Sequence, residues 1–152
     1  MARLNRVAME EGLPFGRREK TYNSRLAQEL GKWAESEDKG EPFHKAAFYA
    51  YFVDGINIAR ISNLVKLAAQ VGLSTQEAQE VLEKRIFKDA VDSDWKRSRE
   101  MGVTAVPTFM MNRKAVVGAQ PYDVLERFLV QNHVERRLSY SESAWCTTKK
   151  PF

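Results

Sequence analysis

The sequence predicts an α/β fold that is mostly helical, with one β-hairpin near the C-terminal end. Apolar residues recur at helical spacing over residues 2–100 of the 152-residue chain, in runs that end at glycines. After Gly102 the pattern changes to short apolar runs on either side of Asn112 and Arg113, which is typical of a hairpin. Because 43% of the residues are hydrophobic, the chain can bury a core.

The first two helices are predicted over residues 2–11 and from Asn23 to before Gly40. Gly12 can end the first helix, because glycine readily adopts the left-handed backbone conformation. Asn23 can cap the second, since its side chain can accept a hydrogen bond from a backbone N–H of the first turn.

The third helix is predicted to open at Glu41-Pro42 and to end at Gly55. Proline is tolerated at the first helical position, where its missing N–H is not needed. Phe48 and Phe52 lie four residues apart on one face, and we assign both to the core.

Three more helices are predicted before the hairpin. The fourth covers residues 61–71 and ends at Gly72. The run Ser74–Glu77 matches a capping box, in which the serine hydroxyl and the glutamate side chain each accept a backbone N–H bond from the other residue, and it opens the fifth. The sixth follows Phe87 and ends before Gly102.

The hairpin is predicted to join a strand over Val106–Met111 to a strand over Ala115–Val117. A last helix opens at Gln120-Pro121, and a polar tail begins at Ser139. Two strands do not form a stable sheet alone, so the hairpin must find further strands or lie against helices.

Charge and composition argue against several functions. The net charge of +4 arises from 24 basic residues spread among 20 acidic ones, so nucleic-acid binding is not predicted. No apolar run approaches the roughly 18 residues that a membrane span requires, and no signal peptide is recognisable, so we expect no membrane association and a cytoplasmic location.

Cysteine and histidine content predicts no metal site. Cys146 is the one cysteine, so the sequence contains neither a Cys-x-x-Cys pair nor an intrachain disulfide. His44 and His133 are far apart and lack metal-ligand spacing. Thiol–disulfide exchange needs an activated thiolate and a second sulfur, and Cys146 in a polar tail meets neither requirement. No catalytic residue is therefore assigned.

Several motifs together resemble one family. The segment Gly102–Phe109 reads Gly-Val-x-x-Val-Pro-Thr-Phe, and Val117–Pro121 carries Gly-Ala-Gln after the second strand. With Gly12–Phe15, Asn23–Ala27 and Ala50–Ile58 upstream, the chain resembles DsbA-like thioredoxin-fold proteins of the FrnE type over roughly residues 4 to 131.

The resemblance implies a DsbA-like thioredoxin fold interrupted by a helical insertion. Residues 1–101 would be that insertion, 102–138 the closing strand-strand-helix unit, and 139–152 a tail. The family's N-terminal strand-helix-strand unit, which carries its Cys-x-x-Cys pair, has no counterpart after Met1. We therefore expect this chain by itself to be inactive.

The resemblance also implies a substrate-binding site at Ala105, Val106 and Pro107. In the family this X-Pro bond is cis, which exposes the backbone of the preceding residue to an extended substrate peptide or to glutathione. The aromatic run of the third helix implies a possible cleft that includes Tyr49 and Tyr51. Asn23 could contact a ligand there, although its capping role explains it sufficiently.

Three functions remain open. The first is a DsbA/FrnE-like thiol–disulfide oxidoreductase, and the second is a glutathione-dependent relative similar to 2-hydroxychromene-2-carboxylate isomerase or kappa-class glutathione transferase. The third is a non-catalytic binding module. Because the resemblance implies a strand edge without its neighbouring strands, we also expect a homodimer.

Overall fold

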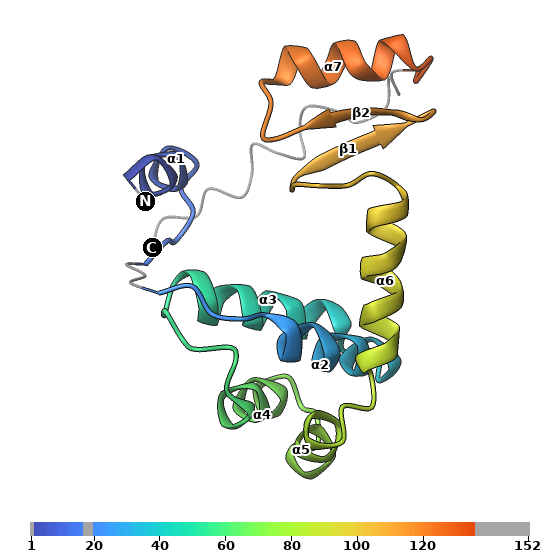
Figure 1. Ribbon diagram of the computed structural model, residues 1–152. Coiled ribbons are helices and arrows are strands. Elements are labelled where there is room, and N and C mark those ends of the chain that lie inside the picture. Colours follow the sequence, from blue (N-terminus) through green and yellow to red (C-terminus); the bar gives the residue numbers. More distant parts are fainter. Residues whose placement is uncertain (1, 17–19, 136–152) are drawn as a thin grey trace. The chain divides into compact units, whose positions relative to one another are not determined.

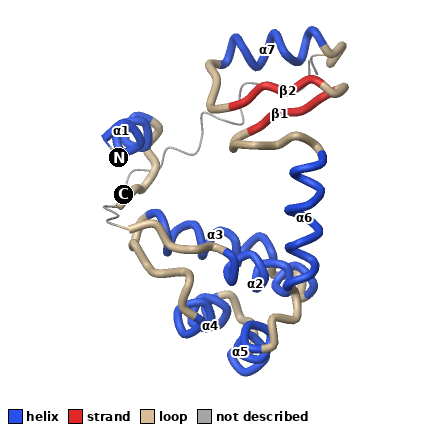
Figure 2. Tube along the Cα trace, in the orientation of Figure 1, coloured by secondary structure: helices blue, strands red, loops and turns tan. Residues whose placement is uncertain are grey.

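The computed structural model describes residues 2–16 and 20–135. It is mostly helical with a small antiparallel sheet, as the sequence predicts (Figures 1 and 2). The elements are α1 (Ala2–Glu10), α2 (Arg25–Ser36), α3 (Gly40–Phe52), α4 (Ile61–Gln70), α5 (Thr75–Glu83), α6 (Lys88–Glu100), β1 (Thr108–Met111), β2 (Lys114–Val117) and α7 (Tyr122–Gln131). By its internal contacts the chain divides into two compact units, Met1–Ser98 and Arg99–Phe152, which we call the helical unit and the hairpin unit.

The core of the helical unit lies among four helices. Helix α2 contacts α3, α4 and α5, and α4 packs on α5 (Figure 1). The largest apolar side chains that are fully enclosed come from four different helices: Leu30, Phe43, Leu64 and Leu82. This arrangement explains the helical apolar periodicity of the sequence, since each helix buries one stripe against its neighbours.

The helix ends follow the sequence signals closely. Gly12, Gly55, Gly72 and Gly102 all have positive φ, as predicted for helix-ending glycines. Half of the predicted capping box is present: the Ser74 hydroxyl accepts from the Glu77 N–H at 3.3 Å. No return bond from the Glu77 side chain is present among the described residues.

Three predicted helix starts need correction by one or two residues. One of them is α7, which begins at Tyr122 with Pro121 just before it. Helix α3 begins at Gly40, so Pro42 is its third residue, a position in the first turn where the backbone N–H has no intrahelical partner either. Helix α2 begins at Arg25, whose N–H donates to Asn23 Oδ1 at 2.8 Å. Asn23 therefore satisfies a donor of the first turn from just outside the helix.

The assignment of Phe48 to the core is wrong. Phe48 is 63% exposed and Phe52 is half-buried, whereas Phe43 is 0% exposed. Phe48 lies five positions after Phe43, which places the two on different faces of α3. Because the face with Phe43 and Ala50 meets the other helices, the face with Phe48 is left outside.

The hairpin unit is built on a two-stranded antiparallel ladder. Thr108 pairs with Val117, and the register continues to Met111 and Lys114. Asn112 and Arg113 have φ values of 50° and 62°, which suit the primed turns that connect two-residue hairpins. The first strand was predicted to start at Val106 but starts at Thr108, because Pro107 has no N–H to donate to a ladder.

Candidate substrate-binding site

The backbone just before β1 is exposed and contains a cis peptide bond. Val106 is 86% exposed, and the Val106–Pro107 peptide bond is cis. The neighbours on both sides are held: the Ala105 carbonyl accepts from the Thr108 hydroxyl at 2.6 Å, and the Pro107 carbonyl accepts from the Gly118 N–H at 2.8 Å. Among the described residues, the N–H and C=O of Val106 have no hydrogen-bond partner.

This geometry offers binding by backbone hydrogen bonds. A free donor and a free acceptor on one exposed residue, fixed between two anchored neighbours, can pair with an extended peptide as an added strand would. Residues 105–108 contain no ionisable side chain, so they supply no acid, base or nucleophile.

The residues proposed for a cleft, Asn23, Tyr49 and Tyr51, all belong to the helical unit and line different hollows. Asn23 borders a small hollow beside Arg25 and Arg85. Tyr49 is half-exposed and borders a larger one of about 850 Å³. Tyr51 borders a third hollow and is in ring contact with Tyr22 at 6.5 Å. The structure therefore does not gather these three side chains around one cavity.

The hollow of about 850 Å³ lies on the outer face of α3. Its lining is mainly apolar and comprises Ala8, Leu13, Pro14, Phe15, Glu35, Gly40, Glu41, His44, Lys45, Phe48, Tyr49, Phe52 and Val53. His44, Phe48 and Phe52 follow each other at four-residue spacing with successive ring centroids 6.5 and 6.2 Å apart. The aromatic run of the sequence thus forms an exposed face as well as part of the core.

His44 is seated against a glycine. A Cβ at Gly31 would lie 2.8 Å from His44 Cε1, so the absence of a side chain on α2 lets the imidazole approach. The ring's Nε2 lies 3.2 Å from Glu35 Oε1. Both side chains of this contact are partly exposed. Among the described residues, no group of histidine, cysteine and acidic side chains could hold a metal.

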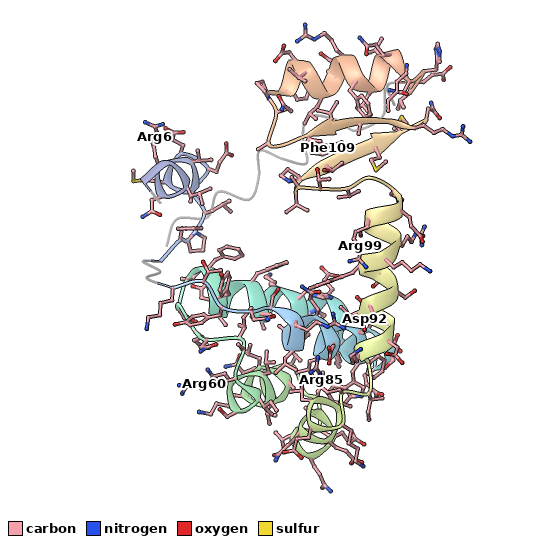
Figure 3. The ribbon with its side chains drawn as sticks, viewed as in Figure 1. Arg6, Arg60, Arg85, Asp92, Arg99 and Phe109 are labelled. Carbon is pink, nitrogen blue, oxygen red and sulfur yellow. The ribbon has the colours of Figure 1, made fainter. Side chains whose placement is uncertain are left out.

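A buried carboxylate that was not predicted from the sequence connects three segments of the helical unit. Glu29 is 0% exposed and receives bonds from Arg25 Nε at 2.7 Å and from Arg85 Nε and Nη2 at 2.6 and 2.7 Å. Arg25 also contacts Asp92 on α6 (Figure 3 labels Arg85 and Asp92). The signal was present, since Glu29 falls within the apolar stripe of α2, where an unpaired charge would be very costly.

The charges around Glu29 keep it ionised. The Arg85 guanidinium, which donates two hydrogen bonds, holds the pKa of the Glu29 carboxyl below its usual value, and the bond from Arg25 acts in the same direction against the effect of burial. Bonds from Lys88 and then Arg25 lower the pKa of Asp92 as well.

Some expectations drawn from the sequence concern residues outside the described ranges. Cys146 and the tail 139–152 belong to that undescribed part, so the separation of Cys146 from Pro107 stays a prediction. In the described ranges, no helix combines the length and the apolar character needed to cross a bilayer.

The comparisons with known proteins agree with the fold. A model of the DSBA-like thioredoxin domain matches residues 1–130. The uncharacterized protein YwbO of Bacillus subtilis is 35% identical over 103 residues, which is 67% of this chain and 52% of YwbO. The chain thus spans about half the length of this curated relative.

Two solved structures are similar as well. A probable DsbA oxidoreductase from Streptomyces coelicolor has a TM-score of 0.72 and 29% identity, over 86% of this chain and 57% of that one. The cytosolic disulfide reductase DsbM of Pseudomonas aeruginosa, solved with GSH, has a TM-score of 0.57 and 23% identity over 83% and 71% of the two chains, and it supports the fold alone. Because the family model covers most of the sequence, the chain belongs to the DSBA-like thioredoxin domain family.

Proposed function

We propose that this chain is the substrate-holding part of a thiol–disulfide oxidoreductase of the FrnE type, which binds an extended segment of a protein substrate at Val106. The observation that carries the proposal is the exposed Val106 with its unpaired N–H and C=O, two residues before β1. Family membership supports the chemistry, and Gly118-Ala119-Gln120 after β2 favours the FrnE branch.

The role of this chain is binding. Disulfide exchange uses an attacking thiolate and a second sulfur, and the 152 residues contain one cysteine. The purified chain is therefore expected to bind a substrate peptide without turning over disulfides when a dithiol donor is supplied. A cytoplasmic location for this function stays a prediction.

Val106→Pro is expected to weaken peptide binding about tenfold, because it removes the N–H that would donate to the substrate backbone, a loss of up to about 1.5 kcal/mol. Val106→Ala, which keeps the backbone groups, should bind nearly as well as the unchanged chain. Fluorescence anisotropy with a labelled, S-alkylated unfolded peptide measures both affinities.

The pair of variants separates backbone from side-chain recognition. Equal losses in Val106→Ala and Val106→Pro would show that the valine side chain is recognised, which contradicts strand-like pairing. Glutathione, the other ligand proposed for this site, serves as competitor: displacement of the peptide would favour the glutathione-dependent branch of the family.

We also propose that the chain forms a homodimer through the hairpin. Within the described residues the sheet has two strands, so each strand has an unpaired edge, and Phe109, Met110 and Val117 are partly exposed beside it. Light scattering at micromolar concentration should give twice the 17.5 kDa mass of one chain. The Met110→Lys variant should give the mass of a single chain. Val130→Lys on α7 is the control, and a monomer mass for the unchanged chain would contradict the dimer.

A further inference from the structure

The segment just before β1 is tied to the hairpin by a hydrogen bond from one side chain. Over residues 103–106 of the described structure, the only hydrogen bond is the one that the Thr108 hydroxyl donates to the Ala105 carbonyl at 2.6 Å. Backbone bonds resume at Pro107, whose carbonyl accepts from the Gly118 N–H at 2.8 Å. Thr108 therefore supplies the polar tie of a segment that is exposed at all but its first residue.

The strand ladder does not provide a second tie for this segment. The bond from Gly118 to Pro107 makes these two residues a hydrogen-bonded pair, and such pairs alternate along an antiparallel ladder. Thr108 and Val117 are thus a pair without mutual backbone bonds, and the backbone N–H of Thr108 points away from β2. Pro107 has no N–H at all. The Thr108 hydroxyl is therefore the donor that remains to hold the preceding carbonyl.

We propose that Thr108 is a positioning residue for the binding of an extended peptide at Val106, an inference that rests on the proposed function. Its hydroxyl fixes the carbonyl just before Val106, and the Gly118 N–H fixes the carbonyl just after it. The free N–H and C=O of Val106 are held in one orientation between these two points. Binding then loses less backbone freedom, because part of the ordering is already complete in the free chain.

The side chain of Thr108 offers two replacements that separate the hydrogen bond from the shape. The branched Cβ of threonine restricts χ1 and favours a strand position, so the hydroxyl is presented with little loss of rotamer freedom. Valine keeps the branched shape and lacks the hydroxyl. Serine keeps the hydroxyl and lacks the branch.

Thr108→Val is expected to weaken binding of the S-alkylated unfolded peptide to the full chain about fivefold, the usual effect of losing one hydrogen bond. Thr108→Ser should restore most of the affinity, because the donor is present again. Thr104→Val is the control: it is the same replacement at an exposed threonine that makes no hydrogen bond in the described structure, and it should leave the affinity unchanged. Fluorescence anisotropy measures the four affinities.

Backbone dynamics of the chain without peptide test the tie separately from the proposed function. The NMR order parameter of the Val106 amide should lie near about 0.85 in the unchanged chain and in Thr104→Val, and fall below about 0.6 in Thr108→Val. Thermal unfolding of each variant checks that the fold is intact. An unchanged order parameter in Thr108→Val, or an unchanged affinity of this variant for a peptide that the unchanged chain binds, would overturn the inference.

A failure of the proposed function gives a different result. If the unchanged chain binds no peptide, the proposed function and the role of Thr108 in binding are both refuted. The order parameters still show in that case whether the hydroxyl orders Val106.

Discussion

Glu29→Gln is expected to lower the free energy of unfolding by about 3 kcal/mol. The change leaves two guanidiniums beside a neutral amide in a place where the carboxylate is fully enclosed, and breaking a buried ion pair by removing one partner typically costs about 3 to 5 kcal/mol. The lower figure applies because the Arg85 side chain is 41% exposed and can be hydrated in part. Urea unfolding followed by far-ultraviolet circular dichroism measures the difference.

Acid titration distinguishes this ion cluster from ordinary packing. Because the folded-state pKa of Glu29 lies below its usual value of 4.5, its contribution is complete above that value and is lost as the pH falls through the folded pKa. The unchanged chain should therefore lose more stability than Glu29→Gln does on acidification from neutral pH. Glu37→Gln, an exposed position after the end of α2, is the control. Equal stabilities of the unchanged chain and Glu29→Gln at neutral pH would refute the structural role of the cluster.

Phe43→Ala is expected to lower the free energy of unfolding by about 3 to 5 kcal/mol, because it empties a fully enclosed site in the core. Phe48→Ala on the same helix removes the same atoms from a side chain that is mostly exposed, and it should change stability by less than about 0.5 kcal/mol. The two variants share helix, residue type and replacement, so helix propensity cancels in the comparison. A cost for Phe48→Ala as large as that for Phe43→Ala would contradict the orientation of α3.

The helical architecture could be predicted because its signals are local. Glycines placed for left-handed helix ends, a serine three residues before a glutamate, and apolar stripes each depend on a few neighbouring residues. The side of α3 that faces the core could not be predicted in the same way. Phe43 and Phe48 both lie in the aromatic-rich sequence of α3, and only the packing of α2 and α4 against the face with Phe43 distinguishes them.

The part of the candidate site that lies within a sequence motif could be predicted. The motif around Val106 and Pro107 indicated the hairpin entrance, and the structure shows that Val106 itself lies before the ladder. The cluster at Glu29 depends on Arg85, which is 56 residues away in sequence. A pairing at that separation leaves no periodic trace, although a glutamate in the apolar stripe of a helix is a signal that a partner exists.

Pairing of the Val106 backbone with an extended substrate is central to the proposed function, and the amide of Val106 reports on it most directly. In a titration of the isotope-labelled chain with an S-alkylated unfolded peptide, we expect a saturable shift of the Val106 amide signal and slower hydrogen exchange at that amide in the bound state. A saturable interaction that leaves the Val106 amide signal and its exchange rate unchanged would contradict this pairing.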